Sequence, residues 1–182
     1  MRPAAGSGSL LVVTGPPGAG KSTVARGVAA RFERSVCIDG DAFFAFLANG
    51  AIEPWLPEAD EQNDTVIQAA AAAAGRYAMG DYVAVYDGIV GRWYLDAFAR
   101  AAGLGALHYV MLMPSVETCW ARVQGRSEHA FRDEAATEHM HRQFSSVPIP
   151  ARHVLDPPPD EVDDVVAAVV AMMSAGTARY PA

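Results

Sequence analysis

Lysine and cysteine are both scarce in this chain of 182 residues. The two cysteines, Cys37 and Cys119, lie far apart and form no CxxC or Cys/His pattern, so neither a disulfide framework nor a zinc site is expected. Lys21 is the only lysine in the sequence. A general preference for arginine accounts for the scarcity of lysine, but the one lysine at position 21 still needs an explanation of its own.

Long apolar runs and blocks of basic residues are also missing. No run approaches the length of a membrane span, and residues 1–9 lack the apolar core of a secretory signal, which favours a cytoplasmic protein. The formal net charge is −7 at pH 7, and no cluster of arginines offsets it. Because such a chain repels phosphate backbones, we expect neither a nucleic-acid partner nor a membrane partner.

Apolar segments of strand length alternate with segments of helical length along the whole chain. Its length fits one domain, 1–182, and 51% of its residues are hydrophobic, as in a globular protein. The alternation predicts an α/β fold with a parallel sheet and helices on both faces, and ligands of such sheets bind at the carboxyl ends of the strands. The predicted strands are 10–13, 36–38, 82–86, 106–112 and 153–155. The predicted helices are 21–34, 42–48, 58–79, 93–102, 116–124, 134–144 and 161–174.

A phosphate-binding motif follows the first predicted strand and begins the first predicted helix. It matches G-x-x-x-x-G-K-[ST] at every position, from Gly15 to Ser22. The glycines let successive backbone N–H groups point at phosphate oxygens, while Lys21 bridges the β- and γ-phosphates and the Ser22 hydroxyl ligates Mg²⁺. The motif therefore predicts ATP and Mg²⁺ as cofactors; a Gly/Pro-rich turn without a ligand is the alternative. The residues assigned to nucleotide binding are Gly15, Gly18, Ala19, Gly20, Lys21, Ser22 and Thr23.

Acidic residues end the second and third predicted strands. Asp39 and Asp41 are two residues apart, so in extended chain their carboxylates point the same way. We expect Asp39 to help hold hydrated Mg²⁺, and Asp41, the outer acid, to orient a substrate hydroxyl and take its proton. Asp87 has the position of a Walker B acid that holds a water of Mg²⁺. The alternatives are a helix cap for Asp41 and a turn for Asp87.

A phosphate loop followed by a strand that ends in Asp39-Gly40-Asp41 resembles the small-molecule kinases among the P-loop proteins. Gluconate kinases, adenylylsulfate kinases, chloramphenicol phosphotransferases and zeta toxins share this layout. The resemblance implies a P-loop NTPase fold with a five-stranded parallel sheet in the order 2-3-1-4-5. In the last two families, the acid thought to act as base occupies the place of Asp41. The middle of the sequence departs from each family, so no substrate carries over.

Two arginines four residues apart, Arg122 and Arg126, lie at the end of the helix predicted at 116–124. In related kinases such arginines belong to a lid, which corresponds to about 125–133 here. The resemblance implies that Arg122 lies near adenine and that Arg126 is catalytic, stabilising charge on the transferring phosphate. Solvated helix arginines are the alternative.

The segment after the second strand, about 42–64, is expected to cover the substrate. Phe44 and Trp55 are candidate walls of the substrate pocket, and the acids of this segment would suit a cationic or polyhydroxylated ligand. Arg92, after the third strand, is a candidate for binding a phosphate or a substrate carboxylate. The alternatives are core packing for the phenylalanines, stabilisation of a helix start for the acids, and a solvated Arg92.

These residues together predict an ATP-dependent phosphotransferase that moves the γ-phosphate of ATP to a hydroxyl of a small metabolite or antibiotic. A zeta-like nucleotide-sugar kinase or a nucleotide kinase is an alternative. A regulatory ATPase is a further alternative, although the sequence has no base-reading N-K-x-D motif of a GTPase. A monomer and a homodimer both fit.

Overall fold

All five predicted strands are present and form one parallel sheet in the predicted order, β2-β3-β1-β4-β5. The computed structural model describes residues 8–125 and 133–182. The strands of this sheet are β1 (Ser9–Thr14), β2 (Ser35–Asp39), β3 (Val83–Asp87), β4 (Ala106–Leu112) and β5 (Val154–Leu155). Side chains of β1 from Leu10 to Val13 are at most 1% exposed, because this central strand is covered on both faces.

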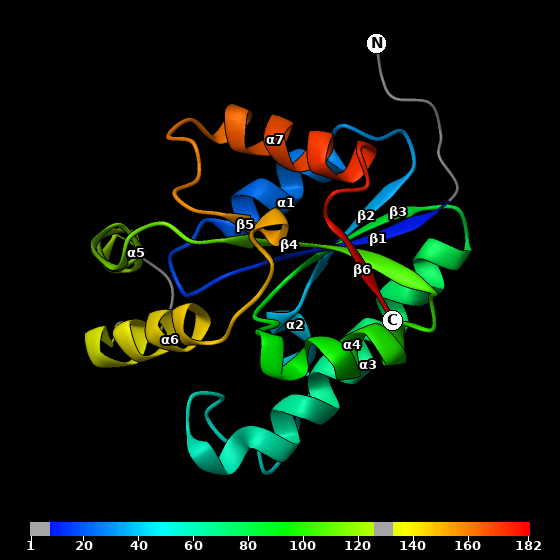
Figure 1. Ribbon diagram of the computed structural model, residues 1–182. Helices are drawn as coiled ribbons and strands as arrows, with labels where there is room; N and C mark the ends of the chain where they lie inside the picture. Colours follow the sequence, from blue (N-terminus) through cyan, green and yellow to red (C-terminus); the bar gives the residue numbers. More distant parts are fainter. Residues whose placement is uncertain (1–7, 126–132) are drawn as a thin grey trace.

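Helices cover both faces of the sheet (Figure 1). On one face lie α1 (Lys21–Ala29) and α7 (Val162–Ser174), and on the other lie α3 (Asp60–Met79) and α4 (Arg92–Ala102). The remaining helical segments are α2 (Asp41–Phe44), η1 (Pro57–Ala59), α5 (Val116–Gln124), α6 (Glu134–Ser146) and η2 (Ala151–His153). Alternate residues of β1 belong to opposite cores, so this central strand contributes to both.

A sixth strand, β6 (Arg179–Pro181), was not expected from the sequence. It pairs antiparallel with the first residues of β4, with Leu107 opposite Tyr180. Three residues ending in proline are too few to show the period-two pattern that marks a strand. The five parallel strands of the predicted fold are therefore extended by one short antiparallel strand.

Two helices are shorter than predicted. The first, predicted over 21–34, ends at Ala29, where the N–H groups of Arg31 and Phe32 bond to carbonyls three residues earlier. The second, predicted over 42–48, covers Asp41–Phe44 and ends in the same way, with i→i−3 bonds from Phe46 and Leu47. Hydrogen bonds of this kind tighten the last turn and end the α-helical pattern that apolar spacing alone would continue.

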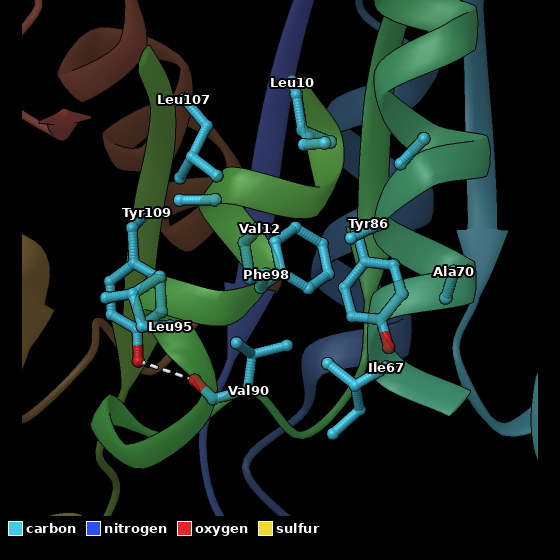
Figure 2. Close-up of a cluster of buried hydrophobic side chains, with 14 of the residues drawn as sticks. Leu10, Val12, Ile67, Ala70, Tyr86, Val90, Leu95, Phe98, Leu107 and Tyr109 are labelled. Atoms are coloured by element: carbon cyan, nitrogen blue, oxygen red, sulfur yellow. Dashed lines mark hydrogen bonds between the residues drawn. The ribbon is translucent and has the colours of Figure 1, made fainter. Parts of the chain in front are cut away.

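The core beneath α3 and α4 fixes the loop that follows β3 (Figure 2). The Tyr109 hydroxyl of β4 donates a hydrogen bond of 2.8 Å to the carbonyl of Val90. The backbone N–H of Val90 donates to Thr14 Oγ1 at 2.9 Å, and all three residues are fully buried. Since both backbone groups of Val90 are satisfied, the chain leaving β3 is held in one position.

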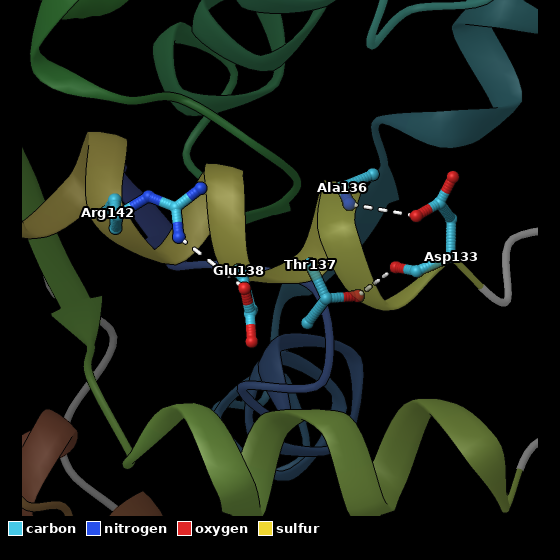
Figure 3. A network of polar contacts seen from close by, with 5 residues as sticks. All are labelled: Asp133, Ala136, Thr137, Glu138 and Arg142. Atoms are coloured by element: carbon cyan, nitrogen blue, oxygen red, sulfur yellow. Dashed lines mark hydrogen bonds and ion pairs between the residues drawn. The ribbon is translucent and has the colours of Figure 1, made fainter.

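Local side-chain contacts fix the start of α6 (Figure 3). Asp133 Oδ1 accepts a hydrogen bond of 3.0 Å from the N–H of Ala136, and its carbonyl accepts one of 2.8 Å from the Thr137 hydroxyl. An i,i+4 pair between Arg142 and Glu138 at 3.5 Å follows one turn later. Asp133 is thus a helix cap, the role that aspartate favours at this position.

Helices α3 and α4 approach each other closely at Gly75. A Cβ atom on this buried glycine would lie 1.9 Å from the carbonyl oxygen of Ala102. No L-residue with a side chain fits there unless the two helices move apart.

We therefore expect Gly75→Ala to destabilise the protein by about 1–3 kcal/mol, because the helices must separate. The sign is opposite to the roughly 1 kcal/mol that alanine gains over glycine inside a helix. Urea denaturation measures the change. Gly80→Ala is the matched control, since its Cβ would have no atom nearer than 3.4 Å. Equal stability of the Gly75→Ala variant and the wild type would contradict the close contact.

Candidate functional site

The motif between β1 and α1 adopts a glycine-dependent loop. Gly15, Gly18 and Gly20 have φ values of 144°, 81° and 93°, which side-chain-bearing residues rarely adopt. A Cβ on Gly18 would also lie 2.1 Å from the carbonyl oxygen of Cys119. Helix α1 starts with Gly20 at its N-cap, and no side chain caps it. The first N–H groups of a helix form an anion-binding site, so this helix start has the arrangement of a phosphate loop.

The charged group of Lys21 lies over this loop, where its Nζ atom donates a hydrogen bond of 3.1 Å to the carbonyl of Pro16. The side chain spans the loop from the helix start back to the second loop residue. The single lysine of the sequence therefore lies at the glycine-rich turn, and its contact with phosphate stays a prediction.

Asp87, the last residue of β3, is buried beside the first turn of α1. Burial raises the pKa of its carboxyl, whereas the facing Ser22 hydroxyl and the Lys21 ammonium lower it by a smaller amount. Asp39 and Asp41 add a further upward contribution. The structure thus brings the predicted metal residues Ser22, Asp39 and Asp87 to one edge of the sheet with Lys21 and Asp41.

The two acids at the end of β2 have different surroundings. Asp39 pairs with Asp87 in the parallel register, and its Oδ1 atom accepts a hydrogen bond of 3.0 Å from the N–H of Asp41. Helix α2 begins at Asp41 with Gly40 at the N-cap, so the alternative reading of Asp41 as the cap is wrong. No described residue donates a hydrogen bond to the Asp41 carboxylate, which is exposed at the surface.

A cavity of about 170 Å³ adjoins the phosphate loop on the side of Arg122. Arg122 Nη1 lies 3.5 Å from the carbonyl of Gly18, so its guanidinium lies against the loop. Pro158 and Pro159, in the segment after β5, also line the cavity. The lining residues are Ala19, Gly20, Thr23, Val24, Leu112, Arg122, Pro158, Pro159, Asp160, Val162 and Val165. Arg126 and most of the predicted lid, 125–133, lie outside the described residues.

Phe44, Trp55 and Arg92, the residues predicted to contact the substrate, lie on different elements of the structure. Phe44 is half-buried on α2, and Trp55, 43% exposed, lies in the segment before η1. Arg92 pairs with Asp96 at 2.8 Å one turn along α4, and its guanidinium lies 6.0 Å from the centre of the Tyr180 ring. The hydrogen bond to Asp96 raises the pKa of Arg92. Its binding of a substrate group stays a prediction.

Side-chain amides of α3 bind the backbone of the segment before it, which is part of the predicted substrate cover, 42–64. Gln62 exchanges two hydrogen bonds with the backbone of Ile52, at 2.8 and 2.7 Å, and Asn63 Nδ2 donates to the carbonyl of Pro54 at 2.7 Å. Between this segment and α3 lies an open hollow of about 360 Å³. It is lined by Leu47, Gly50, Ile52, Glu58, Glu61, Gln62, Thr65 and Val66.

Sequence reasoning missed Thr14 and Tyr109, which fix Val90 beside the site. Thr14 had a signal, since it is a polar residue that ends an apolar strand next to the phosphate loop. Tyr109 had none, because its partner is a backbone carbonyl that is remote in sequence. Within residues 8–125 and 133–182, no three His, Cys, Asp or Glu side chains gather to hold a metal by themselves. None of the described helices is long and apolar enough to cross a membrane.

Comparison with known proteins agrees with this geometry. Residues 10–147 match the model of the family described as AAA domain. No curated protein matches the sequence.

Several solved structures have a similar fold at low sequence identity, among them the following three. The tunicamycin resistance protein of Deinococcus radiodurans is 13% identical, with a TM-score of 0.68 over 96% of this chain and 99% of that one. A gluconokinase from Sinorhizobium meliloti 1021 is 23% identical, with a TM-score of 0.63 over 94% of each chain. Shikimate kinase from Acinetobacter baumannii, in complex with shikimate, is 17% identical, with a TM-score of 0.63 over 92% of this chain and 94% of that one.

The raised pKa of Asp87 makes stability depend on pH. The native state holds this proton more tightly than the unfolded chain, so stability falls as pH rises from the ordinary aspartate range through the raised pKa. Asp87→Asn should remove this slope and raise the melting temperature at neutral pH without divalent cations. Melting curves against pH measure it, with the exposed Glu33→Gln as control. An unchanged pH profile in Asp87→Asn would contradict the buried carboxyl.

Proposed function

The chain belongs to the AAA domain family of P-loop proteins, and from this membership we propose that it is an ATP-dependent phosphotransferase. The acceptor is a hydroxyl of a small molecule, either a metabolite or an antibiotic. The observation that carries the proposal is an exposed acid, Asp41, two residues after the end of β2, whose last residue Asp39 pairs with Asp87; Ser22 and Lys21 face that same Asp87.

The contrast between Asp39 and Asp41 favours Asp41 as the base. The Asp39 carboxylate already accepts a hydrogen bond from the N–H of Asp41 in its own turn. The Asp41 carboxylate has no such donor among the described residues and faces solvent. A free carboxylate beside the phosphate site can accept a hydrogen bond from an incoming hydroxyl and then take its proton.

The transfer follows from these positions. Asp41 removes the proton of the acceptor hydroxyl as the acceptor oxygen forms a bond to the γ-phosphorus. The bond between the γ-phosphorus and the β–γ bridging oxygen breaks, and its electron pair stays on the β-phosphate of ADP. Lys21 and the loop N–H groups hold the phosphate oxygens in line with the acceptor. The products are ADP and a phosphate ester.

The oxygen atoms present fit Mg²⁺. The Ser22 hydroxyl and the Asp87 carboxylate face each other, and Mg²⁺ prefers oxygen donors supplied by one or two carboxylates and by substrate phosphates. In this proposal Ser22 would ligate the ion, and Asp87 and Asp39 would orient its waters. The ion supplies charge that neutralises the transferring phosphate.

Small-molecule acceptors are supported by the structural neighbours. The similarity in fold extends over 94% of the gluconokinase chain and 94% of the shikimate kinase chain. The names of both enzymes specify small hydroxyl-bearing acceptors. The lid role of Arg126 and the adenine role of Arg122 belong to the same proposal; the cavity beside Arg122 supports the second.

Nucleotide binding is tested by Lys21→Ala. Loss of the ammonium removes a charge-assisted contact, so the affinity for ATP–Mg²⁺ should fall roughly 10- to 100-fold while the protein stays folded. Isothermal titration with ATP–Mg²⁺ measures it. Arg26→Ala, which removes another cation of α1, serves as control. Equal affinity of Lys21→Ala and wild type would refute the site.

The roles of Asp39 and Asp41 can be tested separately by replacing each with asparagine. With an acceptor found by an ATP-consumption screen over sugars, aminoglycosides, other antibiotics and nucleosides, Asp41→Asn should lower turnover by roughly 10²–10⁴. Its ATP affinity and melting temperature should stay close to wild type. Asp39→Asn should instead raise the Mg²⁺ concentration needed for activity. The reverse pattern would exchange the two roles, and ADP formation that no acceptor stimulates would favour a regulatory ATPase.

A further inference from the structure

The cavity beside Arg122 can discriminate between nucleotide bases. Its volume of about 170 Å³ is below the roughly 300–1,000 Å³ of pockets that hold a whole ligand, so it takes only part of one. Ala19 and Gly20 of the phosphate loop contribute to its lining, as do residues of the segment between β5 and α7. Because the phosphates occupy the loop in the proposed reaction, the base of the nucleotide occupies this cavity.

Much of the lining suits a flat, largely apolar ring. Val24 of α1, Leu112 of β4 and Val165 of α7 line the cavity and are buried. Val162, the first residue of α7, also lines it but is 47% exposed. A bound base would cover apolar surface of this kind that is now open to water, which favours binding without selecting one base over another. Selection between bases therefore depends on the polar side chains of the lining.

The polar side chains among the described lining residues are Thr23, Arg122 and Asp160. The guanidinium of Arg122 is held near the phosphate loop: its Nη1 atom lies 3.5 Å from the carbonyl of Gly18, and a Cβ on Gly20 would lie 3.6 Å from the same atom. Asp160 is exposed, two residues before the start of α7. No described residue donates a hydrogen bond to its carboxylate or forms an ion pair with it. Its oxygens are therefore available to a ligand.

A carboxylate distinguishes the two purines by hydrogen-bond type, because its oxygens only accept. A purine is joined to ribose through its five-membered ring, so the end of the base that points away from the phosphates carries position 6. Adenine has an amino group there, which donates, whereas guanine has a carbonyl oxygen, which accepts. A carboxylate at this end of the base bonds to adenine and repels the guanine oxygen.

We propose that Asp160 is a specificity residue of the nucleotide site: its carboxylate accepts a hydrogen bond from the 6-amino group of adenine and so selects ATP over GTP. The inference rests on the proposed function, because that function assigns the base to the cavity beside Arg122. It requires no further cofactor and no change in the transfer step itself.

Equilibrium binding of nucleoside diphosphates tests the proposal without an acceptor and without turnover. The probes are ADP, GDP and purine riboside 5′-diphosphate, which is ADP without its 6-amino group, each measured by isothermal titration with Mg²⁺. Wild type should bind ADP about 3- to 10-fold more tightly than the purine riboside analogue, the value of one hydrogen bond. It should also bind ADP more tightly than GDP.

Two variants of Asp160 assign this preference to the carboxylate. Asp160→Ala should bind ADP and the purine riboside analogue equally, because the acceptor is gone. Asp160→Asn should narrow the preference for ADP over GDP, since an amide can donate to a carbonyl as well as accept from an amino group. Asp164→Asn is the matched control: it removes an exposed acid of α7 that does not line the cavity, and it should keep the wild-type ratios. A general change in charge or stability would alter all three affinities by the same factor.

Four results overturn the inference. Wild type binds the purine riboside analogue as tightly as ADP, wild type binds GDP more tightly than ADP, Asp160→Ala keeps the wild-type ratio of ADP to the analogue, or Asp164→Asn changes the ratios as much as Asp160→Asn. None of them decides whether phosphate reaches a hydroxyl. That transfer fails separately, if no acceptor stimulates Asp41-dependent formation of a phosphate ester with either nucleotide as donor.

Discussion

The parallel pairing of β2, β3 and β1 is the constraint on which the candidate site depends. In this register Asp39 lies opposite Asp87, and β1 ends beside them at the start of the phosphate loop. Residues separated by as many as 72 positions in sequence, from Gly15 to Asp87, reach one edge because the strands run in the same direction. The hydrogen bond from Gly40 to the carbonyl of Asp87 continues the pairing one residue past β2 and holds the acidic turn against the neighbouring strand.

Uncharged side chains of the hydrophobic core support the carboxyl-terminal edge of the sheet, where the candidate site lies. Thr14 and Tyr109 satisfy both backbone groups of Val90, so the loop after β3 cannot move without leaving buried polar atoms unpaired. Tyr86 fills the neighbouring position beneath Gly40 and Gly88. The hydrophobic core therefore fixes the position of the acids at this edge, and the proposed phosphoryl transfer would need such fixed positions.

The helical layers and the phosphate loop could be predicted from local pattern in the sequence: apolar strands, helical spacing and glycines at fixed intervals. The sheet order was implied by the resemblance to small-molecule kinases. What could not be predicted depends on partners remote in sequence. The pairing of Arg92 with Asp96 is local, yet its contact with Tyr180 requires β6, which is too short to recognise. Tyr86 reads as an ordinary strand residue until Gly40 and Gly88 are seen on either side of its hydroxyl. The ends of α1 and α2 depend on tight final turns rather than on apolar spacing.

The short antiparallel strand β6 affects which edge of the sheet can pair with another protein chain. β5 pairs with β4 only at Met111 and Leu112, which would leave the first residues of β4 with free backbone groups along an edge of the sheet. β6 occupies that stretch, from Ala106 to His108. Free strand edges recruit strands from other chains and so begin aggregation. By closing this edge with three residues of its own chain, the protein leaves β2, at the opposite border of the sheet, as the long strand with an open side among the described residues.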